Sequence, residues 1–119
     1  MDRAHSLLAE LCEEVERQMK AGLRGPMESV VGSYLQQVWV FETELRTYSV
    51  FVDTEGNARV FPGGDEDRDV TIRWRRDALM KVLQSRKRDS LEPGDYPDVL
   101  VHTDKGRAAF SYLKKYVGL

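Results

Sequence analysis

The first segment of the chain carries hydrophobic residues at helical spacing. Between residues 2 and 19 they recur every three or four positions, and charged residues fill the remainder. This stripe is typical of an amphipathic helix with one buried face. Gly22, Gly25 and Pro26 are expected to end the helix, and residues 27–32 to add one further turn. The stripe consists of Leu7, Leu8, Leu11, Cys12, Val15 and Met19.

The middle of the chain changes to the two-residue alternation of strands. Strands are predicted at residues 34–42, 47–53, 58–61 and 69–75, separated by turn residues. The first two are close enough to form a hairpin, because only a short segment joins them. The fourth shows the clearest alternation, with Val70, Ile72 and Trp74 on one face and charged residues on the other.

Helical spacing returns after the fourth strand. Residues 76–85 are predicted to form a helix, and residues 86–97 a loop, since they are polar and contain prolines. Residues 98–103 read as a fifth strand, and Asp104 is expected to cap a final helix. The predicted buried stripe of that helix is Ala109, Phe110, Leu113 and Val117.

The predicted order of elements is therefore α-β-β-β-β-α-β-α. This order indicates an α+β fold, with a five-stranded, mainly antiparallel sheet covered on one face by helices. The 119 residues are enough for one hydrophobic core, so residues 1–119 are expected to form a single domain.

Charge and composition exclude several classes of function. Lys and Arg number 18 against 20 Asp and Glu, giving a net charge of −2, so nucleic acid is not an expected partner. No apolar run is long enough for a membrane span. A single cysteine and the lack of an apolar leader fit a cytoplasmic protein.

Catalytic and metal-binding signatures are missing from the sequence. His5 and His102 have no cysteine or carboxylate at metal-ligand spacing, and Cys12 lies on an apolar stripe where thiols are inert. His102 alternates away from the apolar face of its strand. The acidic residues 65–69 lack calcium-loop spacing and are read as a solvated turn. We therefore expect no enzyme activity, no metal and no cofactor.

Several segments carry a resemblance to a known family. The run from Tyr48 through Asp53 to Gly56 is an aromatic-led strand that ends in a glycine turn, and Asp69-Val70-Thr71-Ile72 leads into a helix at residues 76–83. With the closing strand and helix after Val99, this pattern resembles the sterol carrier protein 2 family over nearly the whole chain. The segments 85–90 and 96–98 depart from the family pattern, which places glycines there.

The resemblance implies a lipid-binding domain without turnover, whose ligand lies between sheet and helices. Fatty acids, their acyl derivatives and sterols are the expected ligand classes. The basic residues Arg86, Lys87 and Arg88 are candidates for contact with an anionic head group or a membrane surface. The candidate lining residues are Trp39, Phe41, Tyr48, Val50, Val70, Ile72, Leu79, Leu83, Val99, Val101, Phe110 and Leu113.

Two other interpretations of these residues stay open. The lining residues can simply pack on one another as a solid core. A second function, from another class, is a protein-interaction or chaperone-like module that forms homodimers and holds partner segments. Exposure of Val38, Val40 and Phe51 on the outer face of the sheet would favour that function, since contiguous apolar surface marks association.

Overall fold

The computed structural model describes residues 2–26, 28, 32, 34–85 and 91–119. The predicted turn at residues 27–32 and the predicted head-group contact at Arg86, Lys87 and Arg88 therefore lie largely or wholly outside the described residues. The elements follow one another as α1 (Arg3–Leu23), β1 (Gln37–Glu42), β2 (Thr47–Val52), β3 (Ala58–Pro62), β4 (Val70–Arg73), α3 (Arg76–Ser85), the short 3-10 helix η2 (Pro93–Asp95), β5 (Asp98–Val101), α4 (Asp104–Leu113) and the 3-10 helix η3 (Lys114–Val117).

Five strands form one sheet in the order β3-β2-β1-β4-β5. The pairs β1/β2, β2/β3 and β4/β5 are antiparallel, whereas β1 and β4 are parallel. Trp39 lies at the centre, opposite Val50 on β2 and Val70 on β4. The α+β class, the five strands and the order of the elements are confirmed, and α3 has the predicted bounds.

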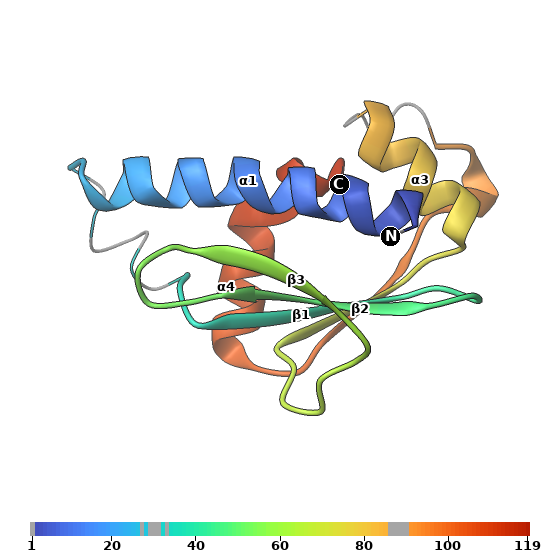
Figure 1. Ribbon diagram of the computed structural model, residues 1–119. Coiled ribbons are helices and arrows are strands. Elements are labelled where there is room, and N and C mark those ends of the chain that lie inside the picture. The colour runs from blue at the N-terminus through green and yellow to red at the C-terminus, as the bar shows by residue number, and fades with distance from the viewer. Residues whose placement is uncertain (1, 27, 29–31, 33, 86–90) are drawn as a thin grey trace.

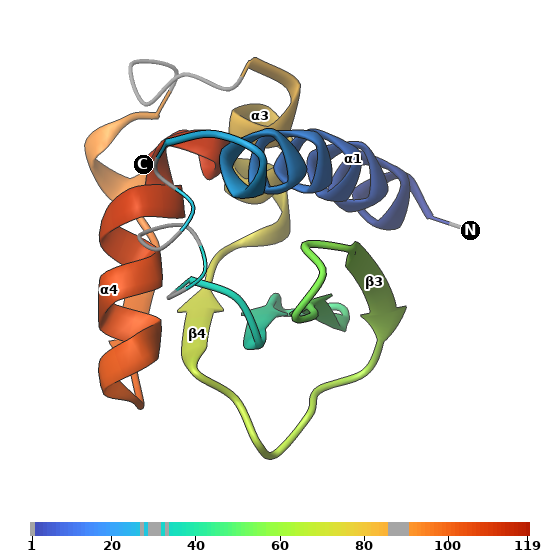
Figure 2. The same ribbon diagram turned by 90° about the vertical axis from the view of Figure 1, so that its left-hand side faces the viewer.

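Helices cover one face of this sheet (Figures 1 and 2). α1 packs against β2 and β3, while α4 packs against β1, β4 and β5. α3 lies beside the first part of α1, and η3 contacts α1. The predicted stripe of α1 is buried, and the helix continues to Leu23. The main core therefore lies between the sheet and these helices.

α1 and β3 run side by side in opposite directions (Figure 1). The Glu16 carboxylate accepts hydrogen bonds from the Ala58 backbone N–H at 3.1 Å and from the Arg59 guanidinium at 2.8 Å. One turn further along α1, a Cβ on Gly56 would lie 3.3 Å from Cβ of Met19. Because β3 is an edge strand, α1 thus shields the rim of the sheet.

The outer face of the sheet is largely covered. Val38 and Phe51 are half-buried and Val40 is 0 % exposed, so the exposure that would favour an interaction module is absent at Val40. The cause is the segment between β3 and β4, where Gly64 approaches Val40 and the Arg68 guanidinium bonds to Glu42 at 2.9 Å. The segment covers the middle of this face and leaves its edges open.

Asp69 joins the start of β4 to two distant parts of the chain. Its buried carboxylate accepts hydrogen bonds from the Val38 backbone N–H at 2.9 Å and from the Thr103 hydroxyl at 2.6 Å. Thr103, not Asp104 as predicted, caps α4, because its hydroxyl accepts from the Gly106 N–H at 3.0 Å. Asp104 lies in the first turn of that helix.

Candidate functional site

A small cavity lies in the core between α1, the sheet and the C-terminal turn. Its volume is about 30 Å³, and the surface that faces it is apolar. Ligand pockets for drug-sized molecules usually measure about 300 Å³ or more. The described residues therefore pack as a nearly solid core in this conformation. The lining residues are Leu11, Cys12, Val15, Trp39, Phe41, Val50, Val52, Leu113, Tyr116 and Val117.

The structure brings only part of the predicted lining set to this cavity. Trp39, Phe41, Val50 and Leu113 line it. The remaining predicted residues lie outside the cavity wall, and all of them except Val101 belong to the same core. Among them Tyr48, Val70, Ile72, Leu79 and Leu83 are buried, and Val99, Val101 and Phe110 are partly buried.

Most of the lining residues absent from the predicted set come from α1 and the C-terminal turn. Leu11, Cys12 and Val15 belong to the amphipathic stripe, which the sequence shows clearly but which predicts only a buried face. Tyr116 and Val117 come from η3, at the end of the last predicted stripe. Helical spacing was thus the available signal, and it cannot tell a cavity wall from solid packing.

Cys12 and one of the two histidines are the residues from which a nucleophile and its base would have to come. Burial raises the pKa of the Cys12 thiol to about 12, so the reactive thiolate is suppressed. His102 is exposed on the far side of the sheet, where its Nε2 lies 2.8 Å from the Thr71 hydroxyl. They do not form a catalytic pair.

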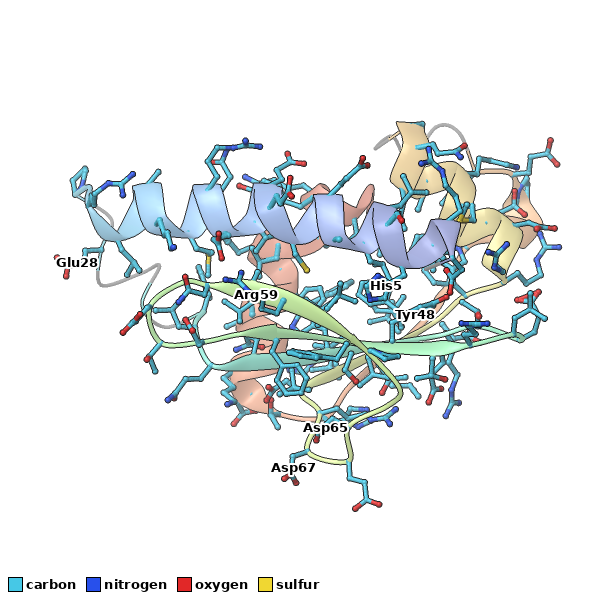
Figure 3. All side chains as sticks on the ribbon, in the orientation of Figure 1. His5, Glu28, Tyr48, Arg59, Asp65 and Asp67 are labelled. Atoms are coloured by element: carbon cyan, nitrogen blue, oxygen red, sulfur yellow. The ribbon has the colours of Figure 1, made fainter. Side chains whose placement is uncertain are left out.

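A surface groove runs between α1 and β3. We call it the α1–β3 groove and define it by His5, Ala9, Cys12, Glu13, Glu16, Ala58, Arg59 and Val60. Its volume is about 290 Å³. Its lining includes the small side chains of Ala9 on α1 and Ala58 on β3. Figure 3 labels two of the lining residues, His5 on α1 and Arg59 on β3.

A hollow of about 460 Å³, with several polar side chains in its wall, adjoins the His5 end of the groove. Here Asp2, the N-cap of α1, accepts a hydrogen bond from the His5 backbone N–H at 2.9 Å. The Tyr48 hydroxyl donates to the same carboxylate, and the Arg46 guanidinium lies 3.4 Å from its Oδ2. The hollow is lined by Asp2, His5, Arg46, Thr47, Tyr48, Pro62 and Gly63.

The electrostatics of this hollow follow from these contacts. The His5 N–H, the Tyr48 hydroxyl and the Arg46 guanidinium together hold the pKa of Asp2 below its ordinary value, against a smaller opposing effect of burial. Burial, together with the Asp2 carboxylate, raises the pKa of Tyr48. The hollow therefore holds an ionised carboxylate, a neutral phenol and a guanidinium at neutral pH.

The described residues form neither a metal site nor a membrane-spanning helix. No three His, Cys, Asp or Glu side chains in the described ranges are placed to hold a metal ion. No described helix is both long enough and apolar enough to cross a membrane. The absence of catalysis stays a prediction.

No protein-family model matches the chain, and no curated protein matches it in sequence. Among solved structures, it is similar to a protein described as "UbiJ-SCP2 Ubiquinone synthesis protein". The two share 16% sequence identity with a TM-score of 0.50, over 87% of this chain and 94% of the other. At this identity the similarity concerns the fold, and it agrees with the element order predicted from the sequence. The chain therefore has the fold of a sterol carrier protein 2 domain.

Proposed function

We propose that this domain binds an apolar molecule, such as a lipid with a long hydrocarbon chain, between its sheet and its helices without chemical turnover. The observation that carries the proposal is the wholly apolar cavity lined by α1, β1, β2 and the C-terminal turn. The lipid-binding character implied by the fold resemblance supports the same function.

The small size of the cavity is compatible with this function for an energetic reason. An empty pocket of about 300 Å³ would destabilise a domain by ~7 kcal/mol at ~24 cal/mol per Å³, which is comparable to its total stability. The observed space of about 30 Å³ carries a small penalty by the same measure. A ligand-free domain is thus expected to close on itself, and ligand binding to open it.

Burial of a hydrocarbon chain supplies enough free energy for such an opening. A chain of twelve carbons gains roughly 10 kcal/mol when it leaves water, before the losses of association and ordering are subtracted. The short η3 helix at the end of the chain, which places Tyr116 and Val117 on the cavity, is the smallest element that could move aside.

The alternative of a protein-interaction module that forms homodimers receives less support. Phe61 and Leu100 are 50% and 39% exposed on the outer face, but they lie on β3 and β5 at opposite edges of the sheet. The residues between them in the same row, Ser49, Val40 and Thr71, are all buried. Among the described residues, Phe61 and Leu100 therefore do not join into one contiguous apolar patch of the kind that marks association.

The test is native mass spectrometry of the purified protein, followed by titration with dodecan-1-ol and with dodecanoate. We expect added mass that leaves only on denaturation, or one bound probe molecule per chain. Val50→Phe, on the cavity wall, should abolish this binding. Val38→Phe, the same substitution on the outer face of the sheet, should retain it.

Two outcomes would contradict the proposal. The first is a chain that carries no extra mass and binds neither probe. The second is an affinity for the probe that is retained in Val50→Phe as fully as in Val38→Phe. This result would place the probe outside the core. A dimer measured by light scattering in the probe-free sample would instead favour the interaction module. Circular dichroism of both variants shows whether they are folded.

A further inference from the structure

The α1–β3 groove lies between the hollow at the surface and the cavity in the core. His5 lines both the hollow and the groove, so these two spaces meet at its side chain. Cys12 lines both the groove and the cavity, so these two meet at the thiol. The three spaces therefore adjoin one another along α1, and His5 and Cys12 are the side chains that lie between them.

His5 has an unusual position at this junction. Its Nδ1 atom is buried and has no hydrogen-bond partner among the residues that the structure describes. A buried polar atom left unpaired destabilises a protein by about 1–3 kcal/mol, so nearly all such atoms find a partner. The imidazole lies beside the Tyr48 ring, with 6.1 Å between the ring centroids (Figure 3). A ligand atom that reaches Nδ1, once the atoms that cover it move aside, would complete this site.

The charges around His5 select the kind of group that fits. The Asp2 carboxylate already has the Arg46 guanidinium 3.4 Å from its Oδ2, and Arg76 acts on the same carboxylate, so these cations already have an anionic partner. An anionic group at Nδ1 would meet the Asp2 carboxylate, which carries its full charge at neutral pH. The Tyr48 hydroxyl donates its proton to Asp2 and keeps lone pairs that can accept from a hydroxyl.

We propose that the ligand lies with its hydrocarbon chain in the α1–β3 groove and with an uncharged, hydroxyl-bearing head group at His5 and Tyr48. This inference rests on the proposed binding of an apolar molecule and adds where it binds and which head group it carries. The hydroxyl exchanges hydrogen bonds with Nδ1 of His5 and the Tyr48 oxygen, and the chain continues past Ala9 towards Cys12.

The first test compares two probes with the same chain and different heads. Dodecan-1-ol and dodecanoate are titrated into the intact chain at pH 8 by calorimetry. The alcohol is expected to bind about 3- to 10-fold more tightly, because the carboxylate would face Asp2. Equal affinities, or tighter binding of dodecanoate, would overturn the assignment of the head group.

The second test uses variants along the α1–β3 groove. His5→Phe keeps a ring and removes both nitrogens, and should weaken dodecan-1-ol binding roughly 2- to 10-fold, the range of one hydrogen bond. His102→Phe, at the other histidine, should leave the affinity unchanged. Ala9→Trp fills the groove and should weaken binding more than 10-fold, whereas Ala108→Trp on the exposed side of α4 should not.

The outcomes separate this inference from the proposed function. Binding that is lost in Val50→Phe but unchanged in His5→Phe and Ala9→Trp would place the ligand in the core alone. This result would agree with the proposed function and would contradict binding in the α1–β3 groove. Absence of binding by the unmodified chain would overturn both. Circular dichroism and urea unfolding of Ala9→Trp confirm that a loss of affinity reflects a filled groove in a folded protein.

Discussion

The Tyr48 hydroxyl lies 2.8 Å from Oδ2 and 2.9 Å from Oδ1 of Asp2, and donates its proton to this carboxylate. Tyr48 is buried on β2, whereas Asp2 is the N-cap of α1. One hydrogen bond therefore attaches the start of the helix to the middle of the sheet, at the hollow that adjoins the α1–β3 groove.

Tyr48→Phe should measurably weaken the fold. A hydrogen bond to a charged acceptor contributes about 1.5–3 kcal/mol, and the ring that remains keeps the packing. We expect the free energy of unfolding in urea to fall by ~2 kcal/mol. In a double-mutant cycle with Asp2→Ala, the two losses should be clearly less than additive. Full additivity would mean that the two side chains do not interact in solution.

The contribution of Asp2 should also depend on pH. Its pKa is lowered in the folded state, so its stabilising effect is fully present above the unfolded value of about 3.9 and is lost as the pH falls through the folded value. The difference in unfolding free energy between the unmodified chain and Asp2→Ala should be constant from pH 5 to 7. This difference in unfolding free energy should shrink below pH 4. Urea titrations at a series of pH values from 7 down to below 4 would measure it. A difference that grows on acidification would contradict this sign.

The Cys12 thiol should be unreactive in the folded chain. With a pKa of about 12, it is almost wholly protonated at pH 8, whereas an ordinary thiol is about a quarter ionised there. Ellman's reagent should react with the native protein more than 100-fold more slowly than with the chain unfolded in urea. A comparable rate in both states would show that α1 opens freely from the sheet.

Asp69→Ala should be among the most destabilising single changes. The buried carboxylate accepts from the Val38 N–H and the Thr103 hydroxyl, so its removal leaves two donors without their partner. We expect a loss of about 2–4 kcal/mol in urea unfolding. Asp67→Ala, an exposed position in the same segment, is the matched control and should change stability by less than ~0.5 kcal/mol. Equal losses at both positions would refute a specific role of Asp69.

Gly106→Ala should disturb the contact between α4 and the sheet. A Cβ at this position would lie 2.6 Å from the Asp69 backbone oxygen, closer than real Cβ atoms come to any neighbour. The helix must shift, so we expect a fall of at least ~2 kcal/mol in unfolding free energy. Gly94→Ala, where no atom lies within 4 Å of the added group, should be neutral or slightly stabilising.

The sequence predicts local structure well where the apolar residues of a segment follow a single periodicity. Residues 76–85 form α3 with the predicted bounds, since the apolar stripe and the polar segment after it agree. The first helix extends past Met19 to Leu23, because Leu23 and the turn at Gly56 pack against each other. The parallel pairing of β1 with β4 escaped prediction, since it depends on how a distant strand returns to the sheet.

The candidate site was predictable only in part for a related reason. Alternation places Trp39, Phe41 and Val50 on the inner face, and all three line the cavity. Alternation also places Val40 on the outer face, yet Arg68 and Gly64 bury it there, and no periodicity describes a loop that folds back over a sheet. The groove depends on small side chains in α1 and β3, whose pairing is a tertiary property.

The hydrogen bond between Glu16 and the Ala58 N–H also affects how the protein can associate with further chains. β3 is an open edge, and an unpaired edge strand is a template on which further chains can add as strands. Here an acceptor from α1 occupies one of its outward donors, and Pro62, at the end of the strand, has no N–H to offer. The helix that closes the core thus also protects the protein from fibril growth.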